Sequence, residues 1–210
     1  ERRDQGLWEL LDHENFTIDT LVDRGSFTYV FKGGTQKKFD TSVSRWLRDG
    51  LIRTRRLART GDTIDLGKDL RIEVVAVNGN DVLASSRARD PAMFEKWPPS
   101  ENDYAIALKF TKGDFEFFTA GDLSGRYVYK TFGPITMSYN DIESVIAEAI
   151  GDIEVYRVNH HGSDNSTNPC FLSVLHPEVS IFSTGDNSYG HPAPRVYQAT
   201  RATGDVWITG

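Results

Sequence analysis

Paired histidines and a Gly-His-Pro sequence stand in two polar loops of the C-terminal half. His160 and His161 follow a β-branched run at 153–158, and His191 follows the polar segment after an apolar run at 179–182. Neutral imidazole is the commonest transition-metal ligand, and loops at neighbouring strand ends can bring several rings to one point. The two loops therefore indicate a metal site, although an isolated loop histidine is usually just solvated.

An aspartate ends another predicted strand. Tyr104–Thr111 and Phe115–Thr119 are β-prone runs joined by a Gly-Asp turn, so they predict an antiparallel hairpin, and Asp122 lies just past its end. A carboxylate that is ionised at neutral pH can bridge or ligate a divalent metal. Gly-Asp after a strand can also be a simple turn cap, so the histidine loops nearby are what favour a ligand role for Asp122.

Helices must connect these strands. Apolar residues recur with helical spacing from Ile142 to Ile150, in a helix predicted to open at Tyr139–Asp141 and to close at Gly151. Asn168-Pro169 predicts another helix start, and Ala193–Ala202 a further helix before a last strand at 206–209. This alternation of strand and helix predicts a mixed α/β fold, with antiparallel hairpins in the first half of the chain.

The N-terminal half supplies scaffold elements. Phe39–Asp49 has the spacing of an amphipathic helix, and Leu51–Thr60 predicts a strand that carries four arginines. Those arginines form either a solvated strand face or a strip that holds phosphates. Asn78–Asp81 predicts a tight turn before a returning strand at 82–83, and Asp90–Ser100 predicts a surface loop.

Composition is that of an ordinary globular protein. The chain has 210 residues and a net charge of −6, which argues against a generally basic nucleic-acid-coating protein but not against a local site. No apolar run approaches the length of about 20 residues of a membrane span. The single cysteine, Cys170, excludes a disulfide within the chain and a cysteine zinc cluster, and we expect its side chain to be buried.

In combination, these motifs resemble a known family. TAGD at 119–122, NHHGS at 159–163 and STGDNSYGHP at 183–192, with ENDYAIAL at 101–108, resemble the metallo-β-lactamase-fold domain of ComEC-type competence proteins and their free-standing relatives. The resemblance covers about residues 60–210. It implies an αββα sandwich, here without its N-terminal portion, and a single domain over residues 1–210.

The resemblance also implies roles for residues. Asp122 matches a metal-bridging aspartate, His160 or His161 matches the HHGS motif, and His191 matches the GHP motif. We expect Asp122, His160 and His191 to bind metal, with Asp122 also catalytic, and His161 to assist proton transfer, although the two neighbouring histidines could exchange roles. The polar positions expected to orient ligands or substrate are Asn102, Ser163 and Asn187. The cofactor would be one or two ions of zinc or manganese, both of which accept nitrogen and oxygen ligands.

One family motif has no counterpart. Family members carry an upstream HxHxDH or HxDxDH cluster with about half of the metal ligands, and His13-Glu14 has neither that pattern nor a preceding apolar strand. We expect the missing ligands to precede Glu1 or to come from a second chain, and the 210-residue chain alone to be nearly inactive.

The function implied is metal-dependent hydrolysis of a phosphodiester, with DNA as the substrate and partner. Two other readings remain open. The acidic net charge favours a small ester, lactone or thioester as substrate on the same fold, and a degenerate domain that only binds a partner would need no complete metal site.

Overall fold

A computed structural model describes residues 8, 11, 17–25 and 34–210, and the chain divides into two compact units. Unit 1 is Glu1–Ala58 and unit 2 is Arg59–Gly210. The single domain over residues 1–210 therefore stays a prediction. His13-Glu14 lies outside the described residues. No helix among the described residues is long and apolar enough to cross a membrane.

Unit 1 combines two parallel strands with one helix. Its described elements are β1 (Ile18–Asp23), α2 (Gly34–Arg48) and β2 (Ile52–Leu57). α2 is amphipathic, and it buries Val43 and Trp46 in a cluster with Ile52 of β2. The helix predicted over Phe39–Asp49 is confirmed, and it begins earlier, at Gly34.

Three of the four arginines of the predicted run lie on β2, and one of them makes a structural ion pair. Arg55 donates from Nε and Nη2 to the two carboxylate oxygens of Asp23, at 2.7 and 3.0 Å, and Asp40 lies 3.6 Å from the same guanidinium. The hydrogen bond to Asp23 raises the pKa of Arg55. Arg53 reaches Asp19 only at 3.4 Å, and its side chain is 70% exposed. Arg55 is therefore engaged within unit 1 rather than free to bind phosphate.

This difference predicts unequal stability effects. We expect Arg55→Ala to lower the free energy of unfolding by about 1–3 kcal/mol, because it leaves the largely buried Asp23 carboxylate without its paired donors. Arg53→Ala, the matched control on the same strand, should change it by less than about 0.5 kcal/mol. Urea unfolding of both variants measures the difference. Equal losses would show that the paired geometry of Arg55 contributes nothing.

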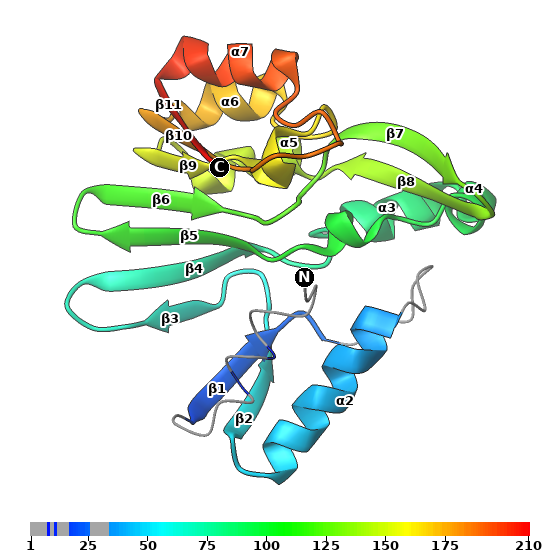
Figure 1. The fold of residues 1–210 in the computed structure, drawn as a ribbon, viewed down its shortest axis with the longest axis vertical. Helices are drawn as coiled ribbons and strands as arrows, with labels where there is room; N and C mark the ends of the chain where they lie inside the picture. The colour runs from blue at the N-terminus through cyan, green and yellow to red at the C-terminus, as the bar shows by residue number, and fades with distance from the viewer. Residues whose placement is uncertain (1–7, 9–10, 12–16, 26–33) are drawn as a thin grey trace. The chain divides into compact units, whose positions relative to one another are not determined.

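The core of unit 2 is a seven-stranded sheet (Figure 1). Its strands are β3 (Thr63–Asp65), β4 (Leu70–Ala76), β5 (Ala107–Lys112), β6 (Phe115–Thr119), β9 (Val155–Arg157), β10 (Val179–Ser183) and β11 (Asp205–Thr209). The order β11-β10-β9-β6-β5-β4-β3 joins two halves. β3 to β6 pair antiparallel, whereas β6, β9, β10 and β11 pair parallel. The predicted mixed α/β class, with hairpins first and alternating helices later, is confirmed.

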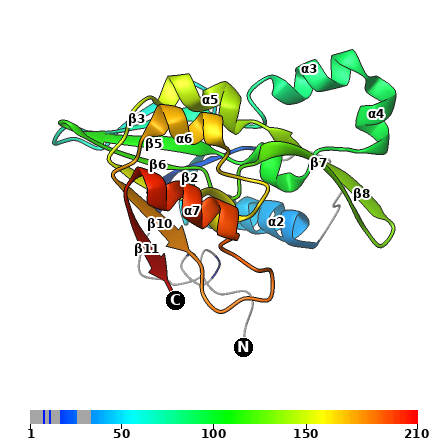
Figure 2. The same cartoon turned by 90° about the horizontal axis from the view of Figure 1, so that it is seen from above.

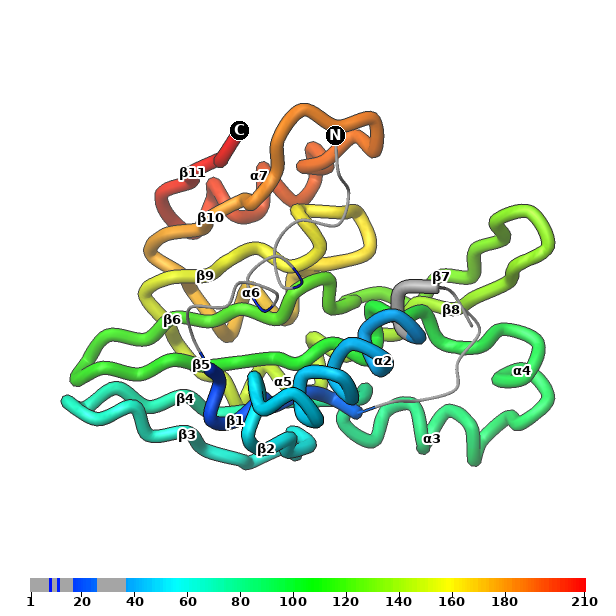
Figure 3. Tube along the Cα trace, turned by 60° about the horizontal axis from the view of Figure 1, so that its bottom comes forward, coloured from blue at the N-terminus to red at the C-terminus, as the bar shows by residue number. Residues whose placement is uncertain are grey.

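Three helices lie together on one face of this sheet (Figures 2 and 3). They are α5 (Glu143–Ile150), α6 (Pro169–Leu175) and α7 (Pro194–Thr203). Between helices and sheet, Phe171 of α6 packs edge-on against Phe118 of β6 and Tyr156 of β9, with ring centroids 5.8 and 5.7 Å apart. All three rings are fully buried, so this aromatic cluster fixes the strands whose ends carry the polar loops.

Unit 2 corrects four sequence-based predictions, one at Cys170 of α6 and three at further elements. The further elements are α3 (Val82–Arg89), α4 (Pro91–Lys96) and the antiparallel ribbon of β7 (Gly125–Phe132) and β8 (Ile135–Asp141). The strand predicted at 82–83 is wrong, because the chain turns into α3. The loop predicted over Asp90–Ser100 is only partly correct, because the Asp90 side chain accepts from Met93 N–H, Pro91 starts α4, and this helix ends at Lys96. Tyr139–Asp141 belongs to β8 rather than opening a helix, and Cys170 is exposed rather than buried.

Candidate active site at the ends of three parallel strands

The polar loops of the candidate site follow three adjacent parallel strands, β6, β9 and β10. Asp122 follows β6, His160 and His161 follow β9, and His191 follows β10. Parallel strands end at the same edge of a sheet, so the three loops meet there. Asn102 approaches this edge from a short helix, η1 (Glu101–Tyr104), ahead of β5, which runs antiparallel to β6. The shared edge expected from the sequence is observed.

Backbone hydrogen bonds tie these loops to one another. The N–H of His160 donates to the Gly121 carbonyl at 2.9 Å, and the N–H of Ala193 donates to the Gly162 carbonyl at 2.8 Å. Gly162 has a φ of +78°, and a Cβ atom there would lie 2.5 Å from the ring of Phe182. Only glycine fits this backbone and this space, so the HHG loop is held against both of its neighbours.

His161 faces Asp122. Its Nδ1 lies 2.5 Å from the Ser183 carbonyl oxygen, and its Nε2 lies 3.4 Å from Asp122 Oδ1. A carbonyl only accepts, so Nδ1 carries a proton, and in the neutral ring Nε2 then presents a lone pair to the carboxylate. Two such acceptors need a proton or a cation between them. Two ligand atoms about 2.1 Å from a tetrahedral ion are about 3.4 Å apart, so the pair has the spacing for one metal ion.

His160 and His191 form a second group beside this pair. Their ring centroids are 5.8 Å apart. Burial lowers the pKa of both rings, the neighbouring histidines and, to a smaller extent, Lys130 lower it further, and Asp122 opposes this lowering. Both rings are therefore neutral at pH 7, which is the form that binds metals. Among the described residues, the buried Nδ1 of His191 has no hydrogen-bond partner.

The predicted polar residues hold the histidine loops. Asn187 donates to the His191 carbonyl at 2.8 Å and accepts from the His191 N–H at 3.1 Å, so it fixes the loop that carries this ring. The buried Ser163 donates its N–H to the His160 carbonyl at 2.8 Å. The amide nitrogen of Asn102 lies 3.4 and 3.5 Å from the two ring nitrogens of His160. Asn187 and Ser163 thus bind backbone groups of the histidine loops, whereas Asn102 lies against the ring of His160.

A buried carboxylate supports the HHG loop from behind. Glu143 is fully buried and accepts from Asn159 Nδ2 at 2.8 Å, from Thr167 N–H at 2.8 Å and from Asn168 N–H at 2.9 Å. Asn159 directly precedes the paired histidines. Burial raises the pKa of Glu143 to about 7, although the three donors act in the opposite direction. Glu143 therefore links α5 to both ends of the loop.

This pKa predicts a pH dependence of stability. Glu143 has an ordinary pKa of 4.5 when unfolded and about 7 when folded, so the unfolded chain loses its proton first and the folded state loses stability as pH rises through that range. Between pH 4.5 and 7 the free energy of unfolding should fall by about 3 kcal/mol from this group, and above pH 7 the group should cause no further change. We expect Glu143→Gln to remove this pH-dependent part of the free energy of unfolding, because glutamine does not titrate. The difference between wild-type and variant unfolding free energies, measured from pH 5 to 8, tests it; a constant difference would contradict the raised pKa.

The β7–β8 ribbon beside the site is not among the elements predicted from the sequence. Lys130 of β7 lies with its Nζ 5.0 Å from the ring centroid of Tyr139 on β8, whose ring centroid lies 6.3 Å from that of His160. A signal was present, because residues 126–130 alternate between tyrosines and Arg, Val or Lys, as a strand with two different faces does.

The described residues offer a pair of metal ligands rather than a complete set. Among the residues that the structure describes, no three or more His, Cys, Asp or Glu side chains come together in a way that could hold a metal ion. The pair of His161 and Asp122 fits one edge of a coordination shell, and His160 and His191 stand next to it. Further ligands would come from water, from substrate or from groups beyond the described residues.

Curated relatives of this chain are competence and recombination proteins. ComE operon protein 3 of Bacillus subtilis (strain 168) is 27% identical over 168 residues, which are 80% of this chain and 18% of that protein. Competence protein ComA of Neisseria gonorrhoeae is 28% identical over 124 residues, 55% of this chain and 16% of that protein. The chain is thus similar in sequence to competence proteins, as its motifs predicted. It spans less than a fifth of the length of these relatives.

Three further comparisons add a short sequence match, a negative result and a distant structural likeness. Recombination protein 2 of Haemophilus influenzae is 44% identical to this chain over 43 residues, 20% of the chain and 6% of that protein. No protein-family profile matches the chain. A proposed zinc-dependent hydrolase of the metallo-β-lactamase superfamily from Thermotoga maritima is 12% identical, covers 92% of this chain and 82% of its own, and has a TM-score of 0.40, a likeness too distant to bear on function.

Proposed function

We propose that this chain carries active-site loops of a metal-dependent hydrolase that cleaves phosphodiester bonds in DNA. The observation that carries the proposal is the pair of His161 and Asp122. The Ser183 carbonyl holds His161 Nδ1 as a donor, which leaves Nε2 facing Asp122 Oδ1 at 3.4 Å. A carbonyl that fixes the tautomer of a histidine is a common arrangement behind metal-binding imidazoles. The names of the relatives, which refer to competence and recombination, support DNA as the substrate.

The geometry favours His161 over His160 as the histidine that shares an ion with Asp122. In the sequence-based assignment, His160 was the ligand and His161 transferred the proton. Here His160 lies beside His191 and Asn102 instead, with its pKa lowered by burial. We assign His160 and His191, both neutral at pH 7, to the substrate side of the pair, where either can be a further ligand or accept a hydrogen bond.

A positively charged cavity beside the loops suits a phosphodiester. The cavity has a volume of about 400 Å³. We call it the cationic pocket, and its lining includes Arg126, Lys130, Ser163, Asp164, Tyr189 and His191. Arg126 Nη1 donates to Asp164 Oδ2 at 2.7 Å, so the net positive charge of the lining comes from Lys130. Burial is the main cause of the lowered pKa of His160 and His191, and the charge of Lys130 adds a smaller lowering at both rings. A phosphate in this pocket would be held by Lys130 next to the candidate metal pair.

A bound divalent ion would activate water and polarise the phosphoryl oxygen at this site. The chain's own residues would do the rest. Asp122 and His161 would hold the ion, Asn187 would hold the His191 loop, and Lys130 would bind and orient the phosphate. Zinc and manganese both accept such a nitrogen and oxygen pair.

The test is a hydrolysis assay on the full-length polypeptide that carries this sequence, stripped of metal and then supplied with zinc or manganese. Substrates are single- and double-stranded DNA, a small phosphodiester and a lactone. We expect metal-dependent cleavage of the phosphodiesters, with binding weakened steeply by salt. Cleavage of the lactone alone would favour the small-ester alternative, and a protein that binds no metal would favour a binding domain without catalysis.

A further inference from the structure

The β7–β8 ribbon separates two cavities of different chemistry. Side chains alternate along a strand, so consecutive residues of β7 face opposite sides. Arg126, Val128 and Lys130 line the cationic pocket. Tyr127 and Tyr129 line a second cavity of about 330 Å³ on the other side, which we call the aromatic pocket. One strand therefore presents positive charge to one cavity and aromatic rings to the other.

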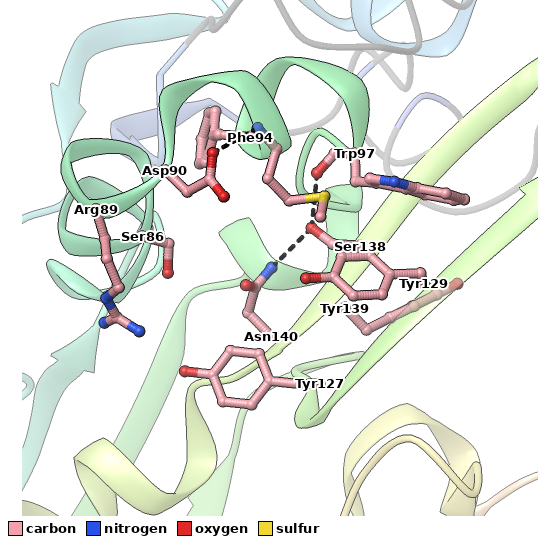
Figure 4. A pocket seen from close by; sticks show the side chains of 11 residues that line it. Ser86, Arg89, Asp90, Phe94, Trp97, Tyr127, Tyr129, Ser138, Tyr139 and Asn140 are labelled. Carbon is pink, nitrogen blue, oxygen red and sulfur yellow. Dashed lines mark hydrogen bonds between the residues drawn. The ribbon is translucent and has the colours of Figure 1, made fainter.

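The aromatic pocket lies between the ribbon and helices α3 and α4 (Figure 4). Tyr127 and Tyr129 are 62% and 56% exposed, so their ring faces are accessible. The ring of Trp97 lies 5.2 Å from that of Tyr129 and extends this surface. Polar groups line the same cavity: Ser138 Oγ donates to the Trp97 carbonyl at 3.0 Å, and Asn140 Nδ2 lies 3.2 Å from Ser138 Oγ. The pocket thus combines stacking faces with hydrogen-bonding groups.

The aromatic pocket adjoins the candidate active site. Tyr139 lines the pocket, and its ring centroid lies 6.3 Å from that of His160. On another side of the same ring, Lys130 Nζ lies 5.0 Å from the centroid. Tyr139 therefore lies between the aromatic pocket, which it lines, and His160 and Lys130, which its ring faces.

We propose that the aromatic pocket holds an unstacked base of a single-stranded nucleic acid whose backbone lies along the cationic pocket. Tyrosine and tryptophan faces bind bases of any sequence by stacking, and a positive groove beside them follows the phosphates. Ser138 and Asn140 are already hydrogen-bonded within the protein. The charged Arg89 and Asp90 also line the pocket, and they suit the polar edges of a base better than a lipid chain. The inference rests on the proposed function, because it places this base next to the phosphodiester at the Asp122 and His161 pair.

The test compares strands that differ only in their bases. The probes are a labelled oligodeoxythymidine and an abasic strand of equal length and charge, with a chelator present so that no hydrolysis occurs. We expect the chain to bind the thymidine strand about tenfold or more tightly, since each stacked base contributes about 1–3 kcal/mol. The double variant Tyr127→Ala/Tyr129→Ala should bind both strands equally. Tyr127→Phe/Tyr129→Phe should keep the preference, because it keeps both rings.

Trp207→Ala is the control, since Trp207 is 66% exposed on β11 and does not line the pocket. It should keep the wild-type preference. No preference in the wild-type chain, or the same preference in the Tyr→Ala double variant, would overturn the proposal. Displacement of the strand by thymidine monophosphate at equal concentration would also overturn it, in favour of a free nucleotide. Because binding is measured without metal, a lack of hydrolysis would count against the proposed function and leave this result standing.

Discussion

His161→Ala is expected to lower metal-dependent phosphodiester hydrolysis more than about a hundredfold. Replacing residues that merely support a metal ligand costs about 10- to 100-fold, so removing the ligand atom itself should cost at least that much. Asp122→Ala should have an effect of similar size, because the two side chains face the same point at 3.4 Å. The measurement is kcat/KM for a small phosphodiester with saturating manganese or zinc, on the full-length polypeptide.

The matched control is His176→Asn. His176 is exposed at the C-terminal end of α6 with a left-handed φ of 38°, a conformation that asparagine tolerates well. The kcat/KM of the His176→Asn variant for the phosphodiester should equal that of the wild type. If His161→Ala retained full activity while His160→Ala abolished it, the sequence-based choice of His160 as the ligand would be restored.

Gly125→Ala is expected to cause the largest loss of stability, about 3–5 kcal/mol. A Cβ atom at Gly125 would lie 1.9 Å from Glu143 Oε2. That oxygen accepts the N–H of Asn168 in a fully buried network, so the carboxylate must move and its donors lose their partner. Urea unfolding measures the loss. The backbone of Gly125 suits alanine, so the effect is steric rather than conformational.

Gly185→Ala is the control for Gly125→Ala. A Cβ atom at Gly185 would meet nothing within 4 Å, and no left-handed backbone opposes it, so its stability should match that of the wild type. A loss of less than about 1 kcal/mol for Gly125→Ala would mean that the Glu143 network relaxes easily and does not hold the histidine loop.

Much of the site's location was predictable from sequence. Apolar runs that end in polar, His-bearing or Asp-bearing loops indicated strand ends, and the parallel order β6, β9, β10 does bring those loops to one edge. The roles within the His160-His161 pair were not predictable. Strand alternation would send the two rings to opposite faces, but both residues lie past β9 with left-handed φ values of 49° and 55°. Their directions follow from a turn rather than a strand, and the Ser183 carbonyl that selects His161 lies 22 residues away.

The supporting structure was harder to predict because it depends on contacts between distant segments. Glu143 resembles an ordinary first-turn glutamate of a helix, yet its partners lie 16 to 25 residues away and bury it completely. α4 has a recognisable start in Asp90-Pro91, but the prolines and polar residues around it have the composition of a loop.

The most direct test of the account follows the ring nitrogens of His161 by long-range ¹⁵N–¹H NMR, with and without zinc. Without metal, we predict a proton on Nδ1, held by the Ser183 carbonyl. On addition of zinc, the Nε2 resonance should move to the range of a metal-bound nitrogen while Nδ1 stays protonated, and Asp122→Ala should weaken this change. A His161 ring that carries its proton on Nε2 alone, or one whose resonances do not respond to zinc, would contradict the central claim that His161 and Asp122 share a metal ion.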